Sequence, residues 1–175
     1  MDATALRAMQ APLKDRYKGD PKAAFITLKA RGTLDDSHIA CKVETGRALA
    51  VAGLHPATGG TGLELCSGDM LLEALVACAG VTLSAVATAI GVELRDAVIK
   101  AEGDLDFRGT LGVSKEAPVG FQNIRLDFLL NTDATAEQLT TLMKLTERYC
   151  VVYQTLAKPP AITLSNRRGP VAQAG

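Results

Sequence analysis

The longest apolar stretch of the chain lies between Glu73 and Glu93, and no charged residue interrupts it. Its length and its content of Ala, Leu and Val predict one long helix. Ser67 is expected to cap this helix, Asp69 falls in its first turn where the helix dipole favours a carboxylate, and Gly91 supplies the C-terminal stop. A helix with no polar face has to be enclosed, so we expect a sheet or a second subunit around it.

Before this helix, the pattern predicts a short helix followed by short strands. Apolar residues at three- and four-residue steps indicate a helical extension over residues 1–20, which Pro12 should bend or end. Three β-like stretches follow, centred on Ile26, Cys41 and Val51. Alternation in the second stretch places the Cys41 thiol on the inner face of its strand, which makes it a core residue.

After the long helix, the pattern predicts two antiparallel strands, over residues 94–107 and 121–131, joined by a loop. A second helix follows. Thr135 and Gln138 form a capping-box pattern, and apolar residues at helical spacing then lead to Cys150 at the end of the inward stripe.

The C-terminal part is expected to contain one more short strand. Pro159 and Pro160 interrupt the chain, A-I-T-L-S over residues 161–165 has strand character, and residues 167–175 are expected to be a mobile tail. Strands and helices therefore do not alternate as βαβ units, and the order predicts an α+β fold with antiparallel sheet in a single domain over residues 1–175.

Composition excludes several classes of function. Nineteen basic and nineteen acidic residues cancel, aromatic residues make up 4% and Trp is absent, so we expect no nucleic-acid partner. The N-terminus lacks the pattern of a secretory signal, which favours the cytoplasm. The apolar run is long enough to span a bilayer, but Glu73, the many alanines and the lack of basic flanks favour a helix inside protein, with no membrane partner.

The cysteines do not form a metal-binding pattern. The chain has four, no C-x-x-C occurs, and His38 and His55 stand apart, so we expect no metal. In a reducing compartment these residues should be mostly thiols, and a disulfide among them would be transient and chemical.

Cys78, in the middle of the long helix, has two interpretations. Free cysteine is among the most buried residue types and packs as a small hydrophobe. Its neighbours Ala77, Ala79 and Gly80 are small, however, and leave room beside the sulfur for a substrate. A reactive thiol also needs a cation or a donor near its anion, and Thr82, one turn later, is a candidate donor.

A cation for Cys78 has to come from outside its helix, which carries no Lys or Arg. Arg47, in a predicted hairpin turn, and Arg148, near the end of the second helix, are candidates, although both equally fit solvated surface arginines. Asp69 precedes Cys78 by nine residues, which at about 100° per residue puts the two on opposite sides of the helix.

These segments together resemble a known family. The helix S-G-D-M-L-L-E-A-L-V-A-C-A-G-V-T-L follows a G-G-T-G loop and precedes, well downstream, E-R-Y-C-V-V-Y-Q-T-L. This pattern is similar to the two-cysteine pattern of the OsmC/Ohr family, the osmotically inducible and organic hydroperoxide resistance proteins. The resemblance extends from about Ala24 to Ser165.

The resemblance implies antiparallel sheets packed around a long buried central helix, in an intertwined homodimer with active sites at the subunit interface. In active members, the thiol matching Cys78 attacks an organic hydroperoxide and becomes a sulfenic acid, which the thiol matching Cys150 resolves as a disulfide. An external dithiol, often a lipoyl group, resets the pair, so no bound cofactor is expected. The family also uses an Arg and a Glu to hold the thiolate, and Arg47 and Asp69 are the candidates here.

The chain departs from the family pattern at two places. The position of the usual Glu corresponds to Gly68 or, one place on, to Asp69, whose side chain is shorter. The second cysteine motif usually reads C-P, whereas Cys150 is followed here by Val151. Cys66 lies outside the pattern, either as an alternative resolving thiol or as a bystander, and the second interpretation is favoured.

Three functions are consistent with these features. The leading one is a thiol peroxidase that uses Cys78 and Cys150. The second is a non-catalytic dimer that binds a small apolar ligand in the Cys78 pocket. The third is a hydrolase or transferase in which Cys78 is the nucleophile and His38 or His55 is the base.

Overall fold

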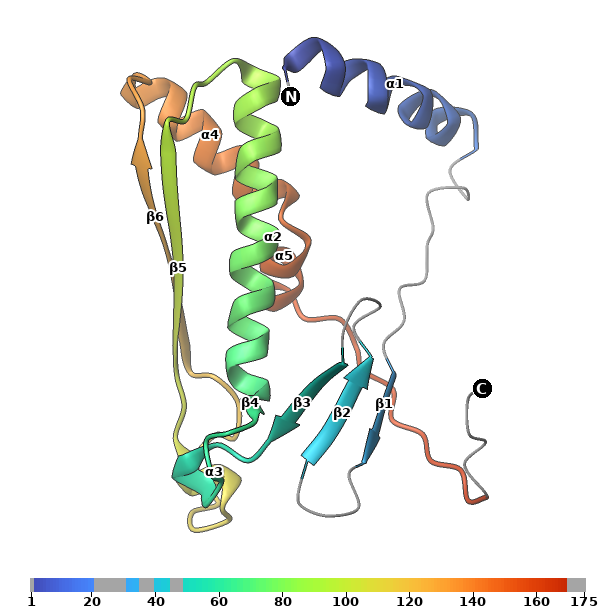
Figure 1. Cartoon of the computed structure of the whole chain (residues 1–175), viewed down its shortest axis with the longest axis vertical. Coiled ribbons are helices and arrows are strands. Elements are labelled where there is room, and N and C mark those ends of the chain that lie inside the picture. The colour runs from blue at the N-terminus through green and yellow to red at the C-terminus, as the bar shows by residue number, and fades with distance from the viewer. Residues whose placement is uncertain (1, 21–30, 35–39, 45–48, 170–175) are drawn as a thin grey trace.

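Helix α2 forms the axis of the computed structural model, which describes residues 2–20, 31–34, 40–44 and 49–169 (Figure 1). In chain order the elements are α1 (Ala3–Gly19), β1 (Arg31–Leu34), β2 (Ala40–Glu44), β3 (Leu49–Gly53), the short 3-10 helix η2 (Pro56–Thr58), β4 (Leu65–Cys66), α2 (Ser67–Ile90), β5 (Asp96–Asp104), α3 (Phe107–Thr110), β6 (Asn123–Asn131), α4 (Ala136–Tyr149) and α5 (Val151–Ala157). The predicted α+β class is confirmed, because helices and strands do not alternate as βαβ units.

Both ends of α2 lie close to their predicted positions. Gly91 ends the helix in the left-handed conformation, with φ of 73°, as expected for a C-terminal glycine. Asp69 lies in the first turn, also as predicted. The prediction for Ser67 was wrong by one residue. Cys66 is the N-cap, because the chain leaves strand β4 there in an extended conformation, and its side chain makes no capping hydrogen bond.

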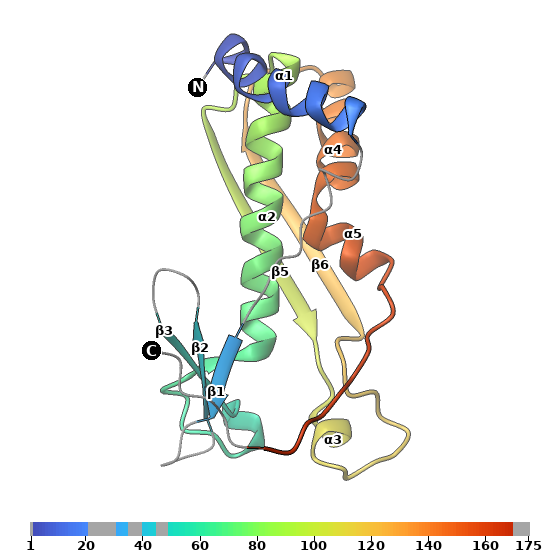
Figure 2. The same cartoon turned by 90° about the vertical axis from the view of Figure 1, so that its right-hand side faces the viewer.

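Within the described part of the chain, helix α2 is covered on one side only. The β5–β6 ribbon and helices α4 and α5 pack along its length, and α1 crosses its C-terminal end (Figures 1 and 2). The opposite side stays open, and Val81 is 73% exposed. Only 28% of the most apolar 18-residue window is buried, although its length and mean hydropathy of 2.0 would suit a membrane span. The predicted enclosure is therefore only partly achieved by one chain.

The buried part of α2 builds the core in two clusters. The first joins the C-terminal half of the helix to α4, where Leu83, Val86 and Leu142 are all buried. The second lies nearer the middle of the helix and joins it to the end of α4, with Leu75, Ala79 and Cys150 buried. Together they fix α4 against α2.

Strands β5 and β6 pair antiparallel over nine residues, as predicted, with Asp96 opposite Asn131 and Asp104 opposite Asn123. Burial alternates along β5, so that one face covers α2 and the other is exposed. On β5, Gly103 lies against the ring of Phe121, and a Cβ there would come within 2.5 Å of ring carbons. The ribbon therefore approaches this aromatic ring more closely than any other residue type would allow.

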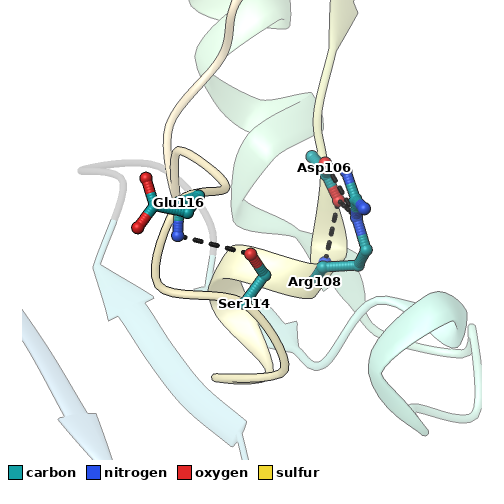
Figure 3. A network of polar contacts seen from close by, with 4 residues as sticks. All are labelled: Asp106, Arg108, Ser114 and Glu116. Carbon is teal, nitrogen blue, oxygen red and sulfur yellow. Dashed lines mark hydrogen bonds and ion pairs between the residues drawn. The ribbon is translucent and has the colours of Figure 1, made fainter.

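Polar contacts order the connection between β5 and β6, which contains the unpredicted helix α3 (Figure 3). The Asp106 carboxylate accepts hydrogen bonds from the backbone N–H of Arg108 at 3.0 Å and from its guanidinium at 2.6 Å. Further along, the Ser114 hydroxyl accepts from the backbone N–H of Glu116 at 3.3 Å. Two local capping contacts thus hold a loop that the sequence pattern leaves irregular.

The first sheet has the order β1-β2-β3-β4 and lies beside the N-terminal end of α2 rather than along it (Figures 1 and 2). The antiparallel β2–β3 pair, with Glu44 opposite Leu49, confirms the predicted hairpin strands. The short strand β4 pairs parallel with β3, which the antiparallel prediction missed. The predicted strand around Ile26 lies outside the described residues.

The predicted N-terminal helix is present as α1, and Pro12 does not end it, because a proline removes only one backbone donor and the turns on either side persist to Gly19. The predicted C-terminal strand was wrong for the single chain. Residues 161–165 form no strand with any described part of the chain, and Ile162 and Leu164 are more than 90% exposed. The expected mobility of residues 167–175 falls largely on residues 170–175, which lie outside the described part.

The α2–α4 contact is expected to dominate stability. Replacing the fully buried Leu142 with Ala leaves a cavity between the helices and should lower the free energy of unfolding by about 2–5 kcal/mol. Leu129→Ala, on the exposed face of β6, should change it by about 0.5 kcal/mol or less. Urea unfolding of both variants measures the difference, and equal effects would contradict this assignment of the core.

Candidate active site

The structure brings Cys78 and Cys150 together although 71 residues separate them in the sequence. Cys78, in the middle of α2, packs against the buried cluster of Leu75, Ala79 and Cys150. The two thiols are within hydrogen-bonding contact, and the Cys150 S–H donates to the Cys78 sulfur. Both are free thiols in the structure. The predicted meeting of these two side chains is therefore present within one chain.

Cys150 occupies the junction of two helices. It is at once the C-cap of α4 and the N-cap of α5, with an extended backbone (φ −72°, ψ 107°). Its N–H donates to the Thr146 carbonyl at 3.0 Å, and its carbonyl accepts from the Gln154 N–H at 3.0 Å. The backbone that carries this thiol is thus held from both helices, while its side chain, 1% exposed, points into the core.

Backbone donors from α5 surround the Cys78 sulfur. Burial alone raises the pKa of the Cys78 thiol, but the N–H groups of Val152 and Val151, the Cys150 thiol and the Thr82 hydroxyl all donate to the sulfur and together bring the pKa below its ordinary value. The first N–H groups of a helix have no partner inside it and are free to serve an anion. Thr82 acts as the donor that its spacing predicted.

The partner thiol is shifted in the opposite direction. Burial raises the pKa of Cys150, and its hydrogen bond to Cys78 and the negative charge of the Cys78 thiolate raise it further, which outweighs the lowering effect of the Tyr153 and Val152 N–H groups. Cys78 is therefore the member of the pair that ionises first. Cys150 keeps its proton and supplies it as a hydrogen bond.

No arginine, lysine or histidine among the described residues contributes to the lowered pKa of Cys78. Arg47 lies outside the described part of the chain. Arg148 is exposed in the last turn of α4, with its guanidinium 5.6 Å from the centre of the Tyr149 ring. The α5 amides take the place of the expected cation, and the sequence does not reveal them because the helix break at Cys150 has no Pro or Gly to signal it.

Asp69 and Cys66 lie at the N-terminal end of α2, away from Cys78 in the middle of the helix. Both line a cavity of about 370 Å³ with His55 and Phe107, near the start of the helix. With a rise of about 1.5 Å per residue, Cys66 is about 18 Å along the axis from Cys78, whereas a disulfide needs α-carbons within about 7 Å. Cys66 of the same chain cannot resolve Cys78.

The histidine positions do not support a nucleophile and base pair in this chain. His55 stacks on Phe107 with ring centres 4.9 Å apart, and its Nδ1 accepts from the Ala57 N–H at 3.0 Å. It shares the Cys66 cavity rather than the Cys78 environment. His38 lies outside the described residues. Over the described ranges, no three His, Cys, Asp or Glu side chains gather closely enough to hold a metal ion.

A cavity of about 470 Å³ opens between α2, β6 and α5, and neither thiol is among its lining residues. Its walls include Leu75, Leu126, Tyr153 and Leu156, and all four also pack in the cluster that holds Cys78 and Cys150. The cavity has the size of a small-molecule site, and polar groups as well as apolar side chains form its surface. A thiol with a lowered pKa and a protonated thiol in contact with it together can perform reversible thiol–disulfide chemistry.

The segment that carries both thiols matches a known protein family. A family profile described as OsmC-like protein matches residues 60–165, which include both Cys78 and Cys150. No curated protein matches the chain significantly by sequence.

Solved structures share the fold at low sequence identity. An OsmC-like protein from Mycoplasma pneumoniae is 13% identical, with a TM-score of 0.64 over 77% of this chain and 89% of that one. An organic hydroperoxide resistance protein OsmC from Legionella pneumophila is 16% identical, with a TM-score of 0.59 over 77% and 92%. The organic hydroperoxide resistance protein OhrB of Bacillus subtilis is 20% identical, with a TM-score of 0.51 over 78% and 94%.

The opposite pKa shifts of the two thiols lead to a measurable difference in reactivity. As pH rises, Cys78 should become alkylated by iodoacetamide at a lower pH than cysteines of the unfolded chain, and Cys150 at a higher pH. Cys150→Ala removes one donor and should move the Cys78 profile to higher pH, whereas Cys150→Ser keeps a donor and should move it less. Site-resolved mass spectrometry gives both profiles, and coincident curves for the two cysteines would refute the assignment.

Proposed function

The chain belongs to the family of OsmC-like proteins, and from that premise we propose that it is a thiol-dependent peroxidase that reduces organic hydroperoxides. Cys78 is the thiol that attacks the peroxide, and Cys150 is the resolving thiol. The name of the family alone does not identify an activity, so the proposal depends on the site.

The observation that carries the proposal is the asymmetry of the thiol pair. A peroxidatic thiol has to be ionised, and the pKa of Cys78 lies below its ordinary value. A resolving thiol has to wait until a sulfenic acid has formed, and the raised pKa of Cys150 keeps it protonated and unreactive until then. Contact between the two sulfurs supports rapid closure of the disulfide.

The chemistry balances in three steps. The Cys78 thiolate attacks the distal oxygen of the hydroperoxide, the O–O bond breaks, and Cys78 becomes a sulfenic acid while the alkoxide takes up a proton and leaves as an alcohol. The Cys150 thiol then attacks the sulfenic sulfur, and water leaves as the disulfide forms. An external dithiol reduces the disulfide by thiol–disulfide exchange and is itself oxidised, so that no bound cofactor is needed.

Arg47 and Asp69 complete the proposed site. Asp69 lies about 13 Å along α2 from Cys78, given a rise of about 1.5 Å per residue, and on the opposite side of the helix, so its own chain does not bring it to the thiol. In a homodimer with active sites at the subunit interface, a second copy is the source of such groups. The uncovered side of α2, where Val81 is exposed, supports a homodimer.

The proposed location is the cytoplasm, where reducing conditions would keep both thiols reduced between turnovers. OsmC-like proteins are soluble, so the family accounts for α2 as a helix inside protein rather than one in a bilayer. Its uncovered face would then be closed by the second subunit.

A second candidate is a non-catalytic dimer that holds a small apolar ligand beside the thiols. The 470 Å³ cavity favours it, because a site of this size can bind a ligand whether or not the thiols react. The position of the usual Glu, which corresponds to Gly68 or to the shorter Asp69, and Val151 in place of Pro also favour it, since both depart from the hydroperoxide-reducing pattern.

Three cysteine variants test the peroxidase. Cys78→Ser should abolish reduction of cumene hydroperoxide with dihydrolipoamide as the reductant, because the nucleophile is gone. Cys150→Ser should let one equivalent of peroxide convert Cys78 to a sulfenic acid that dimedone traps, with little turnover. Cys66→Ser, at the N-cap of the helix that carries Cys78, is the control and should retain wild-type turnover. Peroxide reduction that survives in Cys78→Ser would exclude this mechanism, whereas a wild-type protein that reduces no peroxide but retains a small apolar ligand would favour the ligand-binding dimer.

A separate pair of variants tests the cation. If Arg47 stabilises the thiolate and the peroxide, Arg47→Ala should lower kcat/KM about tenfold or more, because a charge-assisted hydrogen bond is worth about 1.5–3 kcal/mol. Arg148→Ala, which removes an exposed arginine beside Tyr149, should change it less than about twofold. Equal losses in the two variants would remove Arg47 from the site.

A further inference from the structure

The segment A-I-T-L-S at residues 161–165 has the pattern of a strand but pairs with no described part of its own chain. Ile162 and Leu164 are 91% and 95% exposed, so two large apolar side chains lie in water. They alternate with small or polar residues at the three other positions. Such alternation is typical of a strand with one covered face and one face toward solvent. The pattern therefore predicts a surface that covers the side of Ile162 and Leu164.

Strand β5 has an open edge. Among the described residues it pairs only with β6, so the backbone groups along its other edge have no strand partner, and such an edge is a template for a further strand. The side chains of β5 alternate in the same way as those of the segment. Ala97, Ile99 and Ala101 pack toward the core, and the residues between them are exposed.

A groove of about 380 Å³ lies between β5 and helix α2. No residue of β6, α4 or α5 lines it, so it lies on the uncovered side of α2. A strand added to the β5 edge would direct its inward side chains into this groove, as Ala101 does now. The lining residues are apolar except for two carboxylates: Asp69, Leu72, Glu73, Val76, Ala77 and Ala101.

Charge favours the C-terminal segment as the occupant of the groove. Asp69 and Glu73 form no ion pair with any described residue, and no Lys or Arg lines the groove. Arg167 and Arg168 follow the segment within three residues, and Lys158 precedes it by three. Because cations flank the segment at both ends, either direction of the strand brings positive charge toward the acidic groove.

We propose that residues 161–165 of a second copy of the chain add as a strand to the β5 edge, with Ile162 and Leu164 in the groove against α2. In its own chain the segment runs away from α2 on the side opposite to β5, so the occupant has to be another copy (Figure 1). A two-fold dimer contains this contact twice, once for each groove. The contact rests on the homodimer proposed above but not on the peroxidase chemistry, and it closes part of the uncovered side of α2.

Photo-crosslinking tests the contact directly. Dimers are refolded from unlabelled wild-type chains mixed with ¹⁵N-labelled chains that carry p-benzoylphenylalanine at position 164. Mass spectrometry should then find labelled C-terminal peptides joined to unlabelled peptides from α2 or β5. The same probe at position 129, which is also exposed but lies on the outer face of β6, should give no such product. A dimer without these mixed products would overturn the strand contact alone, whereas a wild-type protein that sediments as a monomer would overturn the homodimer as well.

A matched pair of variants measures what the apolar face contributes. Leu164→Asp places a carboxylate in the acidic groove and removes a large apolar side chain, so it should raise the dissociation constant of the dimer about tenfold or more. Thr163→Asp adds the same charge on the face toward solvent and should change the constant less than about threefold. Both positions are exposed in the single chain, so circular dichroism should show the wild-type fold in both variants. Equal dissociation constants for the two variants in sedimentation experiments would contradict the proposed orientation of the strand.

Discussion

The need to remove helix α2 from water organises this chain. Between Glu73 and Glu93 the helix offers no charged residue to solvent, so every neighbouring element is placed by what it covers. The β5–β6 ribbon covers one side, α4 and α5 cover another, and α1 closes the C-terminal end. The two thiols meet because covering α2 draws the α4–α5 junction onto the middle of the helix. The chemistry of the site is a by-product of that packing geometry.

Much of this arrangement can be predicted from periodicity. The limits of α2, the β5–β6 pair and the capping box of α4 follow from local signals that tertiary contacts reinforce, and Thr135 and Gln138 form the reciprocal bonds expected of them. The predictions that failed concern segments whose structure depends on contacts with distant parts of the chain. A two-residue parallel strand at Leu65 and the exposed course of residues 161–165 depend on which partners lie nearby in space, and a strand pattern carries no information about that.

The groups of the candidate site also fall into those that local sequence signals predict and those that depend on the tertiary structure. Cys78, Cys150 and Thr82 are identifiable from small neighbours and helical spacing, because these are properties of single helices. The donors at Val151 and Val152 are backbone groups, which have no residue-type signature, and they become visible only where the chain leaves α4 and starts α5. Asp69 and Arg47 belong to neither group, since one lies at the far end of α2 and the other outside the described residues.

The α4–α5 junction also determines which groups lower the pKa of Cys78. Two of the donors that lower its pKa, the N–H groups of Val151 and Val152, belong to helix α5, which lies far downstream of Cys78 in the sequence. The thiol would therefore not keep its character in a peptide with the sequence of α2, or in a chimera that carried this helix alone. Moving the sequence motif around Cys78 into another protein would therefore not transfer the reactivity of the thiol. The pKa of Cys78 depends on the packing of the whole chain. Any substitution that displaces α5 from α2 should change this pKa even if both cysteines are retained.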